Sequence, residues 1–198
     1  MPKGAGRPGC LWMEVFMMEQ ETITLGGGCF WCTEAVFEQV RGITALQSGY
    51  ANGHSSGAPT YEEVCTGNTG CVEAVQLRFD PSVISVREVL DIFFATHDPT
   101  QLNRQGNDVG TQYRSGVYYS DPAHRELARA MVRQFNEEDR FSAPVVTEIE
   151  PLGRFWPAEH YHKEYYRNNP HQGYCTFVVA PKVQKFRKTF QRYLKEGI

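Results

Sequence analysis

A cysteine at position 29 stands where the sequence predicts that a strand ends and a helix begins. Three glycines, at 26–28, precede it, and Cys32 follows it in a Cys-x-x-Cys arrangement. The start of a helix favours negative charge, so we expect a lowered thiol pKa and a nucleophilic thiolate at Cys29. The alternative is a buried structural cysteine, the usual state of a free thiol. The glycines, the helix start and the two aromatic residues that follow favour the nucleophile.

A glutamate occupies the apolar face of a predicted strand over residues 71–80. By the two-residue period of a strand, Glu73 shares this face with Val75, Leu77 and Phe79. Burial of a carboxylate is costly and raises its pKa, which makes Glu73 a candidate general acid at neutral pH. The alternative is a carboxylate at the end of the sheet that reaches solvent. Cys71 lies on the same face and is expected to pack.

Two further stretches carry polar side chains suited to a site. Residues 100–114 form a long connection rich in hydrogen-bonding side chains, and such loops are often functional. Asp108 and Tyr113 are its best candidates, although an aspartate in such a loop also commonly caps a turn. Thr60 and Glu63 predict a capping box that opens a helical turn at Tyr61, whose phenol either packs or donates a hydrogen bond.

The elements that must position these residues alternate between strands and helices. Strands are predicted over 21–26, 43–51, 71–80, 115–119 and 145–150, and helices over 29–41, 85–96, 122–140 and 181–194. A further helix, crowded with aromatic residues, is predicted to begin within 155–166, and 173–175 is expected to lie in a turn-rich segment. Because some connections are short, an α+β two-layer sandwich with a mixed β-sheet and flanking helices is favoured over a doubly wound parallel sheet.

The composition restricts the class of protein. The chain has 198 residues and a net charge of −3, which gives no electrostatic case for binding nucleic acid or a membrane surface. No apolar run approaches the roughly 20 residues that span a bilayer. We expect residues 1–18 to be a disordered N-terminal extension, with Cys10 a bystander, and residues 19–198 to form a single catalytic domain. Six cysteines are too sparse for a disulfide scaffold, so a reducing compartment, the cytoplasm, is expected.

Several motifs, in order along the chain, resemble those of the peptide methionine sulfoxide reductase A family. They are Gly-Cys-Phe-Trp at 28–31, Thr-Tyr-Glu-Glu-Val at 60–64, Glu-Ala-Val at 73–75, His-Asp-Pro-Thr at 97–100, the stretch 107–115 and Ala-Glu-His-Tyr-His at 158–162. The likeness extends over roughly residues 21–188. It implies a ferredoxin-like core and reduction of methionine-S-sulfoxide, free or in proteins, as repair of oxidative damage.

The resemblance also implies a role for each matching residue. Cys29 would attack the sulfoxide sulfur, and Glu73 would protonate the oxygen, which is a poor leaving group until it is protonated. Methionine then leaves and Cys29 becomes a sulfenic acid. Tyr61 and Tyr113 would hydrogen-bond the oxygen, Asp108 would organise the surroundings of the leaving group, and Phe30 and Trp31 would hold the methyl group.

The sulfenic acid must then be resolved by a second thiol. Cys175 resembles a C-terminal recycling cysteine of the family and is favoured, also because its segment is expected to be flexible. Cys32 is the competitor, since a Cys-x-x-Cys spacing permits a disulfide and many family members carry glycine at that position. The family implies thioredoxin as the final reductant, no bound cofactor or metal, and we expect a monomer.

Two other classes compete with this interpretation. A thioredoxin-like disulfide oxidoreductase would use Cys29 and Cys32 alone, but it leaves the tyrosines and the acid unexplained. A zinc module would use Cys29, Cys32, Cys65 and Cys71, although the last two are spaced more loosely than a usual zinc knuckle. The two histidines at 160 and 162 cannot share a helix face, which argues against a metal-binding pair there.

Overall fold

The fold is built on one six-stranded sheet. The computed structural model describes residues 20–197, so the predicted extension at 1–18 and Cys10 lie outside the described residues. The sheet has the strand order β7-β6-β1-β3-β2-β8, antiparallel throughout except for the parallel pair β6–β7. Its strands are β1 (Glu21–Gly27), β2 (Ile43–Ala51), β3 (Val72–Phe79), β6 (Ser115–Tyr119), β7 (Glu148–Pro151) and β8 (Phe155–Pro157).

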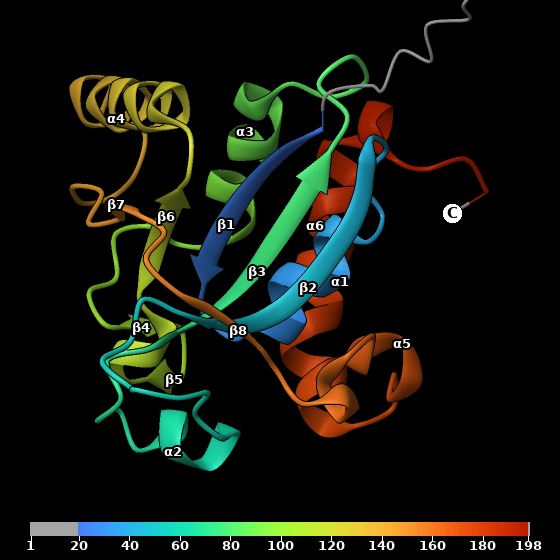
Figure 1. Cartoon of the computed structure of the whole chain (residues 1–198). Coiled ribbons are helices and arrows are strands. Elements are labelled where there is room, and N and C mark those ends of the chain that lie inside the picture. The colour runs from blue at the N-terminus through green and yellow to red at the C-terminus, as the bar shows by residue number, and fades with distance from the viewer. Residues whose placement is uncertain (1–19, 198) are drawn as a thin grey trace, which may run out of the picture.

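Four longer helices flank this sheet, and shorter elements gather at one end of it (Figure 1). The longer helices are α1 (Phe30–Phe37), α3 (Val86–Thr96), α4 (Pro122–Glu137) and α6 (Ala180–Thr189). The shorter elements include α2 (Tyr61–Cys65), α5 (Tyr165–Asn168) and the small hairpin of β4 (Arg104–Gln105) and β5 (Asp108–Val109). Among residues 20–197 no helix is long and apolar enough to cross a membrane.

The topology confirms the predicted α+β sandwich. In chain order the core reads β1-α1-β2-β3-α3-β6, and its strands stand side by side as β6-β1-β3-β2. This is the antiparallel order of a ferredoxin-like core. Antiparallel sheets commonly bury one face more than the other, and here α1, α3 and α6 cover the same face.

The main core lies between that face and the helices. Val75, Leu77 and Phe79 alternate along β3 as the two-residue period predicts, and all three are fully buried. Phe93 of α3 and Phe186 of α6 are buried in the same cluster. Each such side chain contributes roughly 1.5–3 kcal/mol relative to an exposed position. A smaller cluster around Val72, Ala74 and Tyr118 covers the opposite face.

Local signals fixed several element ends as predicted. Thr60 caps α2 in a capping box with Glu63, and Asp121 accepts a hydrogen bond from the backbone N–H of Ala123 at the start of α4. The helix predicted to extend to residue 41 ends at Phe37 instead, because residues 38–42 turn tightly to reach Gly42 at φ +91°. Three other boundaries also differ from the prediction by more than one residue. Strand β7 begins at Glu148 instead of 145, α4 ends at Glu137 instead of 140, and α6 ends at Thr189 instead of 194.

The prediction for residues 155–166 was wrong. These residues form strand β8, a 3₁₀ turn at His160–His162 and only then α5. Pro157 closes the strand, and the backbone N–H of Ala158 still bonds to the sheet at the carbonyl oxygen of Ser48. Glu164 adopts the left-handed conformation at φ 52°, which breaks any continuous helix.

The turn-rich setting expected for Cys175 was also wrong. Cys175–Val179 form a π-helical segment that runs directly into α6. Pro181 has no backbone N–H to donate to the carbonyl oxygen of Phe177, so the ordinary helical bond is missing there and the wider turn takes its place. Cys175 is fully buried within it.

Candidate active site

The candidate site lies at the end of the sheet where β1 ends and β3 and β6 begin. The chain leaves β1 through Gly28, whose φ of +90° suits glycine, and enters α1 with Cys29 as its N-cap residue. A Cβ atom on Gly28 would stand 2.6 Å from the Cβ of Gln105, and one on Gly26 would stand 2.8 Å from Val72. The glycines therefore allow the close packing that sets Cys29 against β3.

Glu73 is buried, as its place on the apolar face of β3 predicted, and it points at the start of α1. It is 1% exposed, and its Oε2 accepts a hydrogen bond of 3.0 Å from the backbone N–H of Phe30, the residue after Cys29. Its Oε1 has no hydrogen-bond partner among the described residues. Burial raises the pKa of Glu73 to about 8, against the opposing effect of the Phe30 N–H. Glu73 is therefore a neutral acid at pH 7 with one oxygen free for a ligand.

The expected lowering of the Cys29 pKa was wrong. Cys29 is only 7% exposed, and burial, with smaller contributions from Cys32 and Glu73, raises the pKa of its thiol. A hydrogen bond from Cys29 instead lowers the pKa of Cys32 to about 7, against its burial and with help from the Lys182 ammonium. The two thiols therefore share their protons, and one negative charge enters this pair near neutral pH.

The predicted polar residues of the loops do gather around Glu73. Tyr61 begins α2 and Tyr113 ends a short 3₁₀ turn; burial and then the nearby Glu73 raise the pKa of both phenols. Both phenols thus stay protonated and able to donate a hydrogen bond. Asp108, on β5, adds to the raised pKa of Glu73 through its charge. Its Oδ2 accepts a hydrogen bond of 2.5 Å from the hydroxyl of Tyr174.

Tyr174 is a site residue that sequence reasoning missed. Its hydroxyl lies 4.0 Å from the Sγ of Cys32, and its ring meets Trp31 edge-on with centroids 5.8 Å apart. Asp108 and Cys32 come from elements that are distant in the sequence, and Tyr174 connects them. Tyr174 directly precedes Cys175, which is a candidate resolving cysteine. That position in the sequence is the one signal that could have pointed to Tyr174.

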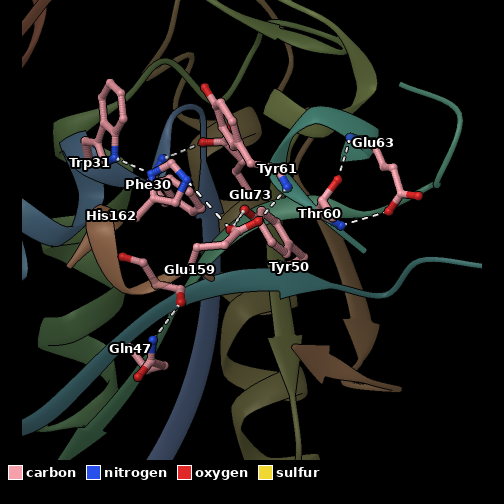
Figure 2. A network of polar contacts seen from close by, with 11 residues as sticks. Phe30, Trp31, Gln47, Tyr50, Thr60, Tyr61, Glu63, Glu73, Glu159 and His162 are labelled. Atoms are coloured by element: carbon pink, nitrogen blue, oxygen red, sulfur yellow. Dashed lines mark hydrogen bonds and ion pairs between the residues drawn. The ribbon is translucent and has the colours of Figure 1, made fainter. Parts of the chain in front are cut away.

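A second group of missed residues lies beside Phe30 and Trp31. The indole Nε1–H of Trp31 donates a 3.0 Å hydrogen bond to Nδ1 of His162, and Nε2 of His162 lies 3.8 Å from Oε2 of Glu159 (Figure 2). The same Oε2 accepts a 2.6 Å hydrogen bond from the hydroxyl of Tyr50. The motif at 158–162 pointed to this segment. Because a helix was expected there, the sequence did not predict which of its side chains point into the protein.

The other cysteines differ in their settings, and Cys65 hydrogen-bonds the phenol of Tyr61. Burial, and then the nearby Cys32, raise the pKa of Cys175, whereas Cys65 is exposed. Cys71 directly precedes β3 and packs in the core, as expected. Within residues 20–197 no three His, Cys, Asp or Glu side chains are grouped so as to hold a metal ion. The four-cysteine zinc set therefore has no counterpart in the described part of the chain.

The assembled site combines a buried thiol, a neutral carboxylic acid and two neutral phenols. The acid has an unpartnered oxygen, and the phenols can donate hydrogen bonds to an oxygen of a ligand. The aromatic rings of Phe30 and Trp31 adjoin the thiol and offer an apolar wall. This set suits attack by sulfur on a polar S–O or C–O group with protonation of the oxygen.

Comparisons with known proteins agree with this chemistry. The profile of the family described as "Peptide methionine sulfoxide reductase" matches residues 21–194. A relative from Ralstonia nicotianae, "Peptide methionine sulfoxide reductase MsrA", is 54% identical over 179 residues, which are 88% of this chain and 93% of that protein.

Solved structures share the fold of this chain. Mxr1 from Saccharomyces cerevisiae in its reduced form is similar with a TM-score of 0.73 and 38% identity, over 79% of this chain and 89% of that one. A structure of Mxr1 in complex with Trx2 is similar with a TM-score of 0.52 and 29% identity, over 74% of this chain and 84% of that one.

Proposed function

Since the chain belongs to the peptide methionine sulfoxide reductase A family and is therefore a methionine sulfoxide-reducing oxidoreductase, we propose that Cys29 and Glu73 carry its reaction. Cys29 Sγ attacks the sulfoxide sulfur, and Glu73 delivers a proton to the sulfoxide oxygen. The observation that carries this proposal is the buried, unpartnered Oε1 of Glu73 on an acid whose other oxygen is fixed by the residue after Cys29.

The thiolate that this step needs comes from the Cys29–Cys32 pair. Burial disfavours a charge on Cys29 alone, but a pair that has lost one proton can carry that charge on either sulfur. Between about pH 7 and 8 the pair is ionised while Glu73 is still protonated. The reactive form has the charge on Cys29, the proton on Cys32 and a second proton on Glu73.

The other site residues bind the substrate. Tyr61 and Tyr113 donate hydrogen bonds to the sulfoxide oxygen, and Phe30 and Trp31 hold the methyl group. Asp108 orders the surroundings of the leaving oxygen through its bond to Tyr174. The substrate is the S epimer of methionine sulfoxide, free or in a protein, as the resemblance to the family implies, and the enzyme repairs oxidised methionine. The hydroxyl formed on the substrate sulfur then passes, with the electron pair of its S–O bond, to Cys29 Sγ. Methionine leaves with the electron pair of the transient S–S bond, and Cys29 is left as a sulfenic acid.

Cys32 is the first thiol to resolve this sulfenic acid. It lies one helical turn from Cys29 and shares a hydrogen bond with it, and its pKa is lowered where that of Cys175 is raised. Cys32 sulfur attacks the sulfenic sulfur, a disulfide forms, and the hydroxyl leaves as water after it takes up a proton. Cys175, which sequence reasoning favoured, lies near Cys32 and takes over the disulfide by exchange.

Thioredoxin then reduces the disulfide and closes the cycle. The similarity to Mxr1, of which one structure is a complex with Trx2, supports this partner. A thioredoxin-dependent cycle needs no bound cofactor or metal, and it fits the reducing, cytoplasmic compartment and the monomeric state expected from the sequence.

A single-turnover experiment tests the proposal. Reduced enzyme is mixed with one equivalent of L-methionine-S-sulfoxide without reductant, and methionine and disulfides are then quantified by mass spectrometry. We expect one methionine per enzyme and a bridge between Cys29 and Cys32, or between Cys32 and Cys175 at later times. A direct bridge between Cys29 and Cys175 would restore the order favoured by the sequence. The R epimer is the matched control and should yield no methionine; absence of product with both epimers would overturn the proposal.

A further inference from the structure

We propose that Glu159 and His162 act as a positioning pair that fixes the Trp31 indole as a wall of the substrate pocket. The inference rests on the proposed function, in which Phe30 and Trp31 hold the methyl group of the sulfoxide. It assigns a task to two residues that take no part in the chemistry proposed above. Figure 2 shows Trp31, His162 and Glu159 following one another beside Phe30 and Glu73.

The hydrogen bond from Trp31 fixes the protonation state of His162. An indole N–H only donates, so Nδ1 of His162, 3.0 Å away, must be the unprotonated nitrogen. His162 is 1% exposed, and burial lowers its pKa, so the ring is neutral and its proton sits on Nε2. That N–H has no hydrogen-bond partner among the described residues, but the negative charge of Glu159 lies near it, with Oε2 3.8 Å from Nε2. The carboxylate therefore favours the one tautomer that accepts from Trp31.

Glu159 is itself held from two other elements. Its Oε2 accepts the 2.6 Å bond from the Tyr50 hydroxyl of β2, and its Oε1 accepts a 2.8 Å bond from the backbone N–H of Tyr61 at the start of α2. Burial raises the pKa of Glu159, but these hydrogen bonds outweigh burial and the pKa is lowered. Glu159 is therefore a fixed carboxylate, and it ties the position of Tyr61 to that of His162.

The Trp31 ring is held on a second side by stacking. Tyr165 of α5 lies parallel to it, with centroids 3.8 Å apart and an interplanar angle of 5°. Stacking alone permits the indole to slide and rotate in its plane, whereas the directional bond to Nδ1 fixes that rotation. Phe30 meets the His162 ring edge-on at 4.9 Å, so both residues of the proposed methyl pocket contact the same imidazole.

Loss of the pair should loosen the pocket without removing the nucleophile or the acid. His162→Leu removes the acceptor and leaves the N–H of the half-buried Trp31 without a partner. The KM for methionine-S-sulfoxide should rise about tenfold, while the single-turnover rate constant at saturating substrate changes less than about threefold. The preference for methionine sulfoxide over ethionine sulfoxide, which has one more methylene, should fall several-fold, because a mobile wall excludes the larger group less well.

His162→Asn is the matched rescue, and His160→Asn is the control. The asparagine Oδ1 can stand close to the position of Nδ1 and accept from Trp31, so KM and the methyl–ethyl preference should return most of the way to wild type. His160 lies two residues away and is exposed, so its substitution should change neither value. Should His162→Leu fail to fold, Glu159→Gln takes its place, with the same changes expected at roughly a third of the size.

A second readout measures the bond directly, independent of activity. The Trp31 indole N–H resonance is assigned in the full chain by its loss in Trp31→Phe. It should be protected from hydrogen exchange in wild type and in His162→Asn, and should lose protection at least tenfold in His162→Leu or Glu159→Gln. Unchanged protection and an unchanged methyl–ethyl preference would overturn the positioning pair. If wild type reduces neither sulfoxide, the proposed function fails, and the exchange measurement still decides whether Trp31 is held through His162.

Discussion

Two buried glutamates, Glu73 packed against the start of helix α1 and Glu34 within that helix, differ in whether their carboxyl groups are available to a ligand. Glu73 and Glu34 are 1% and 2% exposed, and burial raises their pKa values to about 8 and about 7. A raised pKa alone would mark both as acids at neutral pH. Their surroundings differ, and that difference separates a candidate general acid from a structural one.

Glu73 is sealed at the start of α1, with one oxygen on the Phe30 N–H and the other unpartnered beside Cys29. Glu34 lies one turn further along α1 against the backbone N–H groups of Glu164 and Tyr165, which oppose the rise of its pKa. It also lines a cavity of about 480 Å³ with several lysine and arginine side chains. Glu34 thus holds α5 to α1, whereas Glu73 has an oxygen to offer to a ligand.

The largest effect is expected at Cys29, the thiol that lies near Glu73 and not near Glu34. Cys29→Ser should abolish sulfoxide reduction, because a serine hydroxyl is far less nucleophilic and cannot form the sulfenic acid. Methionine formed in a single turnover, followed by mass spectrometry, is the measurement. Cys65→Ser, at an exposed thiol, serves as the control and should keep full activity. Any residual methionine above background in Cys29→Ser would contradict the assignment of the nucleophile.

The two glutamates themselves give the next effect. Glu73→Gln should slow the single-turnover step about 10²–10⁴-fold, the usual contribution of a general acid, with a much smaller change in substrate affinity. Glu34→Gln, which removes the other buried carboxyl, on α1 itself, should change this rate less than about threefold. Equal losses in both variants would show that burial of a carboxyl, and not its position beside Cys29, sets the rate.

Glu73 was predictable from the sequence because its evidence is local. The two-residue period placed it on the apolar face of β3, and a carboxylate there needs a reason. Cys29 was found in the same way, from the glycines and the helix start. The α+β class with a mixed sheet also followed from alternating elements with short connections. These features depend on residues close together in the chain, which is what sequence patterns report.

The rest depended on contacts between distant segments. The Cys29 pKa was misjudged because the helix start is visible in the sequence, whereas the burial that outweighs it is not. His162, Glu159 and Tyr174 were missed because their hydrogen-bond partners come from distant elements, namely α1, β2 and β5 respectively. Glu34 drew no attention, since a glutamate in an amphipathic helix is ordinarily exposed.

The pH dependence of the single-turnover rate separates the thiol pair from the acid. With the pKa of Cys32 at about 7 and that of Glu73 at about 8, the rate should fall below about pH 7, where the thiol pair is fully protonated, and above about pH 8, where Glu73 loses its proton. Quenched-flow measurement of methionine formed in a single turnover, from pH 5 to 10, gives the profile.

Variants assign each limb of that profile. Cys32→Ser should move the acidic limb to higher pH by a unit or more, because Cys29 then ionises alone in a buried site. Glu73→Gln should remove the alkaline limb, and Glu34→Gln should retain both limbs. An acidic limb that stays in place in Cys32→Ser would contradict the shared ionisation of the two thiols.

The smallest expected effect is on stability, and it belongs to Glu34. Its pKa is raised from 4.5 to about 7 in the folded chain, so between these pH values the folded state binds more protons than the unfolded state. The free energy of unfolding must then fall as pH rises from about 4.5 to 7. In Glu34→Gln this contribution disappears, and the fall measured by urea titration should shrink by roughly 1–3 kcal/mol. Glu137→Gln, at the exposed end of α4, should leave the fall unchanged. A fall of wild-type size in Glu34→Gln would mean that Glu34 is already ionised in the folded chain, so that its backbone partners outweigh its burial.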